Sequence, residues 1–212
     1  MLDVQGLLSA LRVGGAVVYP LLLLAVVATV VILEKAFVFA TRARRPADVV
    51  QVLARHDFSW EDLEAGVSRL GPHDYFGRFL RAMLDHRRRP AWWMESRGTE
   101  EAAAIEQSLG RWLWILETIV TAAPLLGLLG TITGMVRAFH LFGTEGLVDP
   151  RGVTGGVAEA LIATAVGLFI ALFALFAFNY FSHRQAAVMN EIEQMGTRVV
   201  DHVRLEGQEA AP

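Results

Sequence analysis

Three long apolar runs dominate the pattern of polar and hydrophobic positions along the chain. No Asp, Glu, Lys, Arg or His occurs in Val13–Leu33, Thr118–Val136 or Ala160–Ser182, which are 21, 19 and 23 residues long. About 20 apolar residues of helix cross the hydrocarbon core of a bilayer, so each run is long enough to span it. The pattern therefore predicts an all-α integral membrane protein with three transmembrane helices.

Apolar residues also recur at helical spacing outside these three runs. One set leads into the second span without interruption and predicts one long helix: Ile105, Leu109, Trp112 and Leu116. An earlier set lies between the first and second spans: Phe76, Phe79, Leu80 and Met83. A final set follows the third span: Val188, Ile192, Met195, Val199 and Val203. The second and third spans are therefore expected to extend as helices into the cytoplasm.

The arginines that flank the spans favour one orientation of the chain. Arg42, Arg44, Arg45 and Arg184 lie on one side, and Arg12, Arg137 and Arg151 lie on the other. This modest asymmetry places the N-terminus outside and the C-terminus inside. The expected parts are an N-terminal segment with the first span at 1–40, a cytoplasmic helical domain at 41–115, the second span at 116–142, a short outer loop at 143–153, the third span at 154–183, and a cytoplasmic C-terminal helix and tail at 184–212.

Drawn as helices, the second and third spans each separate small side chains from large ones. The small residues of the second span share one arc: Ala123, Gly127, Gly130 and Gly134. Those of the third span do the same: Ala160, Ala163, Gly167 and Ala171. Small residues let helices approach closely in lipid, so these two spans are expected to be inner helices and the first a lipid-facing outer one. The small faces are candidates for a pore lining, and plain helix packing is the alternative.

Three polar residues near these faces are candidates for an ion pathway. Glu159 opens the third span, and a charge at the centre of a membrane helix costs about 2.5–3.5 kcal/mol, so an intramembrane acid is functional by default. The alternative is an interfacial glutamate wetted by headgroup water. Thr131 and Thr164 border the small faces, whereas Thr133 lies on the large-residue side of its helix. For Thr131 and Thr164, a hydrogen bond to a carbonyl of the same helix is the alternative to a pore role.

Composition narrows the function further. Hydrophobic residues make up 54% of the chain, the mean hydropathy is +0.41, and the formal net charge is −3, so no basic surface indicates nucleic-acid binding. The chain has no cysteine, and its six histidines include no pair at metal-ligand spacing. No Ser/His/Asp set or paired carboxylates can be recognised. We expect neither an enzyme nor a bound metal or cofactor.

Two segments of the chain resemble the MotA/TolQ/ExbB proton-channel family. They are Ala123–Met135, with the sequence APLLGLLGTITGM, and Gly155–Leu168, with the sequence GGVAEALIATAVGL. The Thr-Gly-Met and Gly-Gly-Val-Ala-Glu-Ala-Leu patterns are most similar to the ExbB branch of the family. One departure is Phe173, because many relatives carry a proline at that point in the third span.

The resemblance implies a homopentamer in the bacterial inner membrane, with a periplasmic N-terminus and a cytoplasmic C-terminus. Its second and third helices would line a central pore that encloses the helices of an ExbD/TolR-like dimer. Thr131 and Thr164 would surround an aspartate of that partner, and Glu159 would serve the pore near its outer end. The implied function is to convert proton motive force into work, through a TonB/TolA-like protein, for transport across the outer membrane.

Two alternatives stay open beside this function. A TolQ-like subunit would serve envelope integrity and division through the same ion chemistry. A structural membrane scaffold would hold partner helices without conducting ions, and it predicts that Glu159 and Thr164 are replaceable. A solute transporter is disfavoured, because no span is broken by Gly and Pro at corresponding points of an inverted repeat.

Overall fold

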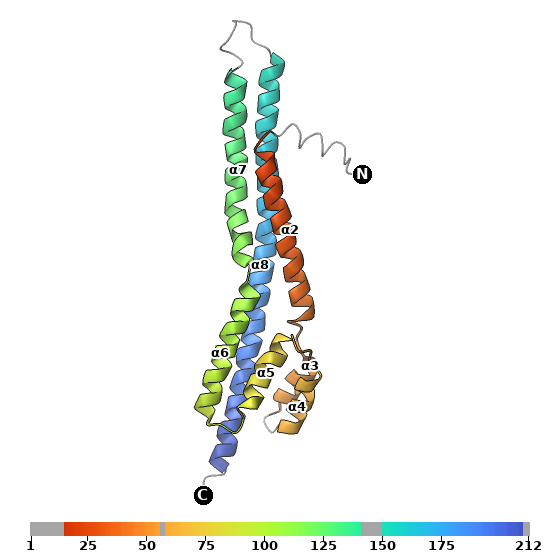
Figure 1. Ribbon diagram of the computed structural model, residues 1–212, viewed down its shortest axis with the longest axis vertical. Helices are drawn as coiled ribbons and strands as arrows, with labels where there is room; N and C mark the ends of the chain where they lie inside the picture. Colours follow the sequence, from red (N-terminus) through yellow and green to blue (C-terminus); the bar gives the residue numbers. More distant parts are fainter. Residues whose placement is uncertain (1–14, 56–57, 141–149, 210–212) are drawn as a thin grey trace. The chain divides into compact units, whose positions relative to one another are not determined.

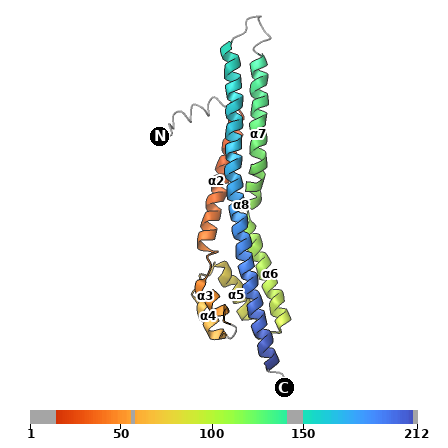
Figure 2. The ribbon, with the colours of Figure 1, turned by 180° about the vertical axis from the view of Figure 1, so that it is seen from behind.

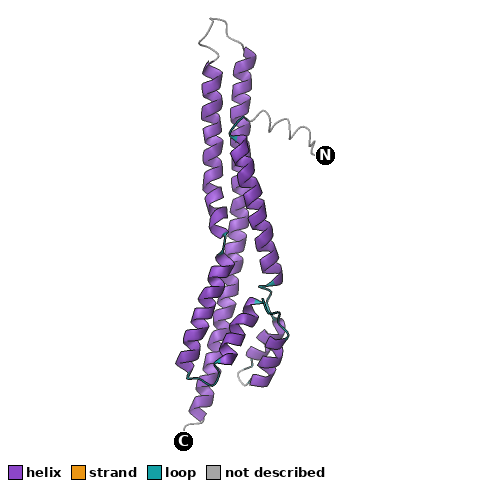
Figure 3. Cartoon of the chain, viewed as in Figure 1, coloured by secondary structure: helices purple, strands orange, loops and turns teal. Residues whose placement is uncertain are grey.

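The computed structural model describes residues 15–55, 58–140 and 150–209, and within them it consists of helices joined by short loops (Figure 3). The helices are α2 (Val18–Thr41), α3 (Ala47–Leu53), α4 (Trp60–Ser68), α5 (Tyr75–Asp85), α6 (Ala91–Gly110), α7 (Leu113–His140) and α8 (Pro150–Glu209). Three helical stretches are long and apolar enough to cross a membrane: Val18–Thr41, Ala91–His140 and Gly152–Glu206. The predicted all-α membrane protein with three spans is confirmed.

The chain divides into two compact units, each with its own set of contacts. The span unit contains the described residues up to Leu33 together with 112–180, and the bundle unit contains 34–111 and the described residues from Phe181 onward. Helices α2 and α8 contribute residues to both units. Helix α8 begins at Pro150, four residues before the predicted start of the third span. The predicted N-terminal segment before Gly15, residues 143–149 of the predicted outer loop and the last three residues lie outside the described part.

In the span unit, α7 and α8 lie side by side (Figures 1 and 2). A Cβ atom placed on Gly127 would lie 3.0 Å from the Cα atom of Thr164, and one on Gly167 would lie 2.5 Å from the carbonyl oxygen of Ala123. The distance at Gly167 is too short for any side chain, and the distance at Gly127 is tighter than most Cβ contacts, so the two backbones lie very close together. The tight packing expected for the second and third spans is therefore present between α7 and α8.

The expected single helix from Ile105 into the second span is wrong, because the helix is interrupted. Helix α6 ends at Gly110, and α7 begins at Leu113. Between them Trp112 has a positive φ of 69°, a conformation that side-chain-bearing residues rarely adopt. The ammonium of Lys35 is fully buried and donates a 2.9 Å hydrogen bond to the carbonyl of Leu109. This bond satisfies a carbonyl at the end of α6, where a cation is also favoured by the helix dipole.

The bundle unit packs the amphipathic helix α5 against α6 and α8. The four apolar residues predicted to share one face of α5 are all buried: Phe76, Phe79, Leu80 and Met83. The stripe after the third span is buried on α8 in the same way at four of its five positions: Val188, Ile192, Met195 and Val199. Phe79 reaches α8 at Gly196, where an added Cβ would lie 2.9 Å from the ring. Both spacing predictions are therefore confirmed.

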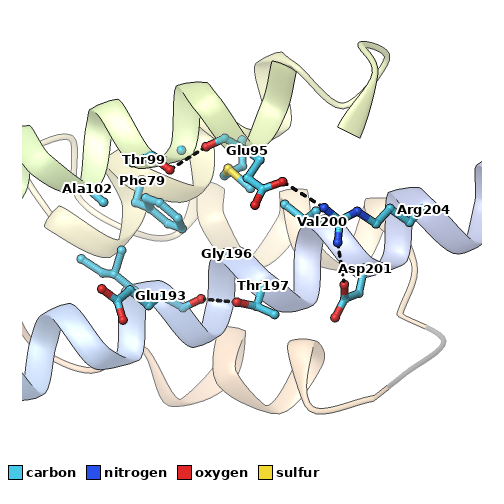
Figure 4. Close-up of a pocket in the computed structure, with 13 residues that line it drawn as sticks. Phe79, Glu95, Thr99, Ala102, Glu193, Gly196, Thr197, Val200, Asp201 and Arg204 are labelled. Atoms are coloured by element: carbon cyan, nitrogen blue, oxygen red, sulfur yellow. Dashed lines mark hydrogen bonds and ion pairs between the residues drawn. The ribbon is translucent and has the colours of Figure 1, made fainter. Parts of the chain in front are cut away.

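A groove of about 310 Å³ remains between α6 and α8 in the bundle unit (Figure 4). Its floor includes Phe79, and the guanidinium of Arg204 pairs at its edge with Glu95, 2.9 Å away, and Asp201, 3.7 Å away. The pair with Glu95 joins α8 to α6, whereas the pair with Asp201 lies within α8. The side chains are about half exposed, so each pair contributes little stability.

Helix α5 depends on Asp74 for its N-terminal cap. The Asp74 carboxylate accepts a 2.9 Å hydrogen bond from the amide of Gly77. Partial burial raises the pKa of Asp74 above its usual value of 3.8, against the opposing effect of backbone hydrogen bonds and Arg81. The folded state therefore holds the proton more tightly than the unfolded chain does. This group's contribution to stability falls as the pH rises from 3.8 through the folded pKa.

We expect Asp74→Ala to lower the free energy of unfolding by about 1 kcal/mol at neutral pH, because the cap is lost. Asp74→Asn keeps an acceptor for the Gly77 amide without burying a charge, so it is expected to match or exceed the wild type at neutral pH. Thermal unfolding of the detergent-solubilised chain between pH 4 and 7 measures both effects. Equal losses in the two variants would contradict the capping role.

Candidate functional site

Glu159 is held by an ion pair near the start of α8. Its Oε1 atom lies 2.7 Å from a guanidinium nitrogen of Arg137 on α7. The glutamate side chain is 19% exposed, whereas that of Arg137 is 57% exposed. A carboxylate this far removed from solvent requires a partner, and the guanidinium supplies a charge-assisted hydrogen bond. Glu159 is therefore paired within its own chain.

The start of α2 forms another wall of this site. Gly15 has a φ of +71°, and its carbonyl accepts a 3.2 Å hydrogen bond from the amide of Val18 at the first residue of α2. A Cβ atom on Gly15 would overlap the carboxylate of Glu159 and lie 3.0 Å from its Cγ atom. The carboxylate therefore occupies the space that any side chain at Gly15 would need. Residues from α7 and α8 and the turn that opens α2 meet at Glu159.

The hydroxyl groups of the candidate threonines bind backbone carbonyls in two different ways. Thr164 on α8 donates a 2.9 Å hydrogen bond across to the carbonyl of Gly127 on α7. Thr131 donates instead to the carbonyl of Leu128 in its own helix, at 2.6 Å, and Thr133 does the same with Gly130, at 3.1 Å. Thr164 therefore joins two helices, while Thr131 makes the local bond that was the alternative to a pore role.

The small residues predicted to line a pore are placed in the contact between α7 and α8. All eight are buried there: Ala123, Gly127, Gly130, Gly134, Ala160, Ala163, Gly167 and Ala171. Their packing within one subunit is the alternative that the sequence left open. A pore-lining role for these residues stays a prediction, as it does for Thr131, Thr164 and Glu159.

Sequence reasoning missed two of the residues that surround Glu159. Gly15 falls just inside the first apolar run, and its positive φ leaves no trace in a hydropathy pattern. Arg137 was used only to orient the chain, although an arginine within an otherwise apolar helical stretch is itself a signal for a buried partner. Within the described residues, no three His, Asp or Glu side chains gather as a metal site. The site offers one carboxylate, that of Glu159, held by the guanidinium of Arg137.

A sequence model of the MotA/TolQ/ExbB proton channel family matches residues 73–194. The chain belongs to this family. The match covers more than half of the chain and includes both α7 and the part of α8 that carries Glu159 and Thr164. Gly15 lies outside it.

Known members of the MotA/TolQ/ExbB family resemble the chain over different lengths. The protein of Synechocystis sp. named ExbB-like 1 is 33% identical over 204 residues, which cover 91% of this chain and 77% of the relative. ExbB-like 3 of the same organism is 32% identical over 84% of this chain and 87% of the relative. The biopolymer transport protein ExbB of Xanthomonas campestris pv. campestris is 43% identical over 79 residues, or 37% of this chain and 31% of the relative. The predicted family is therefore confirmed, and the named relatives are ExbB proteins or ExbB-like.

Proposed function

We propose that the chain is the channel-forming subunit of an inner-membrane complex that converts proton motive force into mechanical work. The subunit assembles as a homopentamer around an ExbD/TolR-like dimer, with its N-terminus in the periplasm. A TonB/TolA-like protein carries the work to transport across the outer membrane. Family membership and the names of the ExbB relatives support this proposal.

The observation that carries the proposal is the single carboxylate in the apolar stretches of α7 and α8, Glu159 near the start of α8. Apart from Glu159, the sequence has no acidic residue in 118–140 or 150–182. A relay of protons through the bilayer therefore needs a further acid from another chain, which the partner dimer supplies. Glu159 loads the pathway from the outer side, and hydroxyl groups such as that of Thr164 lie deeper along α8.

The energy available per ion favours a cyclic motor over a single-shot switch. One charge that crosses 100 mV releases only about 2.3 kcal/mol. Mechanical output against an outer-membrane load needs many successive ions, so the partner must return to its starting state after each one. A ring of identical subunits around the partner provides equivalent positions for this repetition.

The proposed function predicts that the chain assembles into a closed ring of identical subunits. Large apolar side chains on α2, α7 and α8 are more than half exposed in the single subunit, among them Tyr19, Leu125 and Phe169. Lipid and neighbouring subunits would cover this surface, and a closed cyclic assembly uses one interface repeatedly. Native mass spectrometry in mild detergent is expected to show a pentamer. Monomers and dimers alone would contradict the proposal.

Two threonines that lie two residues apart on α7 offer a matched test of the ion pathway. Thr131 and Thr133 are chemically identical, and both donate to carbonyls of α7. Because they lie about 160° apart around an ideal helix, only one of them can face the pore. We expect Thr131→Val to reduce partner-dependent proton uptake in vesicles about tenfold and Thr133→Val to change it less than twofold. Equal effects would overturn the assignment of the pore face.

A further inference from the structure

Glu159 lies where three membrane segments converge, and two of the residues around it have no role in the proposed pathway. Arg137 comes from α7, and Gly15 comes from the turn that opens α2. Both lie in the span unit with Glu159. The first span was expected to be a lipid-facing outer helix, yet the turn that precedes α2 forms part of the wall around the acid.

Position 15 requires glycine for two independent reasons, its backbone conformation and the lack of space for a side chain. Its φ of +71° lies in the left-handed region that favours glycine. A Cβ atom would also overlap the Glu159 carboxylate, so even asparagine, which tolerates a positive φ, would displace the acid. Gly155 on α8 provides the contrast, because a Cβ atom placed there meets nothing within 4 Å.

Arg137 holds the same carboxylate from the opposite helix. The 2.7 Å contact between its guanidinium and Oε1 fixes the end of the Glu159 side chain. The arginine is more than half exposed in the single subunit, so this chain does not enclose its charge when the glutamate binds a proton and becomes neutral. The proton then adds to a carboxylate oxygen, while the guanidinium keeps its own protons and loses only its counter-ion.

We propose that Gly15 and Arg137 are positioning residues that hold the Glu159 carboxylate at the outer entrance of the ion pathway. The first membrane span thereby takes part in ion loading. This inference rests on the proposed channel function, and it adds that the position of the carboxylate, set from α2 and α7, determines the rate of ion entry.

The test compares proton uptake in vesicles that contain the full chain and its partner protein. Gly15→Ala and Gly15→Asn are both expected to lower the rate about tenfold with the ring intact, whereas Gly155→Ala stays within twofold of the wild type. A role limited to backbone strain predicts that Gly15→Asn restores uptake, because asparagine accepts the left-handed conformation. Restored uptake in Gly15→Asn would therefore overturn the positioning role of Gly15.

A separate set of variants tests the positioning role of Arg137 by the same measurement of proton uptake in vesicles. Arg137→Lys keeps the cation and is expected to retain at least half of the uptake, whereas Arg137→Gln loses about tenfold. The exchanged pair Arg137→Glu with Glu159→Arg is expected to keep the ring but not the uptake, because the carboxylate then projects from α7. Full uptake in the exchanged pair would show that the ion pair acts only in packing, which overturns the proposal.

A cysteine pair tests the geometry without any transport. The chain contains no cysteine, so Gly15→Cys with Glu159→Cys introduces the only two thiols. The Cβ position of Gly15 is 3.0 Å from Cγ of Glu159, within reach of a disulfide. We expect oxidation to form a bond within one subunit and to block maleimide labelling, even if the glycine variants fail to assemble. Free thiols after oxidation, or cross-linked dimers, would overturn the proximity on which the inference rests.

The proposed function and this inference fail in different ways. Normal uptake in Glu159→Gln contradicts the channel role of the acid itself. Loss of uptake in Glu159→Gln together with wild-type rates in Gly15→Asn and Arg137→Gln leaves the channel role in place and overturns only the positioning roles.

Discussion

Replacing Gly167 with leucine is expected to prevent α7 and α8 from packing and to remove the assembled ring from the membrane. A Cβ atom at this position lies 2.5 Å from the carbonyl oxygen of Ala123 and 3.1 Å from the Cα atom of Gly127. Both neighbours are backbone atoms of α7, which cannot rotate away as a side chain can. The helices must separate to admit the leucine, and the hydrogen bond from Thr164 to Gly127 is lost with their contact.

The smaller change Gly167→Ala provides a graded version of this prediction. Overpacking of a well-filled contact costs about 1–3 kcal/mol, so the alanine variant should assemble with reduced thermal stability. Gly155→Ala on the same helix is the control, because its Cβ atom meets nothing within 4 Å. Native mass spectrometry and thermal unfolding of the three variants measure ring assembly and stability, which are expected to fall from Gly155→Ala through Gly167→Ala to Gly167→Leu. A Gly167→Leu ring as stable as the wild type would contradict the close contact of α7 and α8.

Removing the charge of Glu159 is expected to stop proton uptake while the ring persists. Glutamine keeps much of the hydrogen-bonding capacity of glutamate but cannot exchange a proton near neutral pH. Arg137 is 57% exposed in the single subunit, so this chain does not enclose the guanidinium after its counter-ion is removed. We therefore expect Glu159→Gln to assemble and to capture its ExbD/TolR-like partner, with partner-dependent uptake reduced at least tenfold.

The alternative of a wetted interfacial glutamate predicts a different outcome for the same variant. Headgroup water would solvate either side chain, so uptake would stay near normal. A collapsed ring would instead make Glu159 a packing residue whose pair with Arg137 joins α7 to α8. Measuring uptake and ring content on the same vesicles separates the three cases.

The sequence predicted those features that depend on local patterns. Charge-free runs located the three spans, because a bilayer requires about 20 apolar residues of helix whatever the neighbours are. The small faces of α7 and α8 followed from helical geometry, since glycine and alanine permit close backbone contact. Helical spacing likewise identified the buried face of α5 around Phe79.

The features that the sequence did not predict depend on contacts between distant residues or on backbone torsions. Gly15 and Glu159 are far apart in the chain, and no periodic pattern connects them. The break between α6 and α7 was hidden because Ile105, Leu109 and Leu116 keep helical spacing on both sides of it. The hydrogen bond found at this break, from the buried ammonium of Lys35 to the carbonyl of Leu109, joins residues 74 positions apart. A helix break of this kind can be recognised only in the folded structure.

Proton uptake by vesicles that contain the purified complex tests the channel function most directly. An imposed proton gradient, with the chain reconstituted alone or together with its ExbD/TolR-like partner, gives the two rates to compare. We expect uptake well above that of empty vesicles only when both proteins are present, because a carboxylate from the partner completes the pathway between Glu159 and the cytoplasm. Uptake no greater than in empty vesicles for the fully assembled complex would contradict the proposal that this chain forms an ion channel.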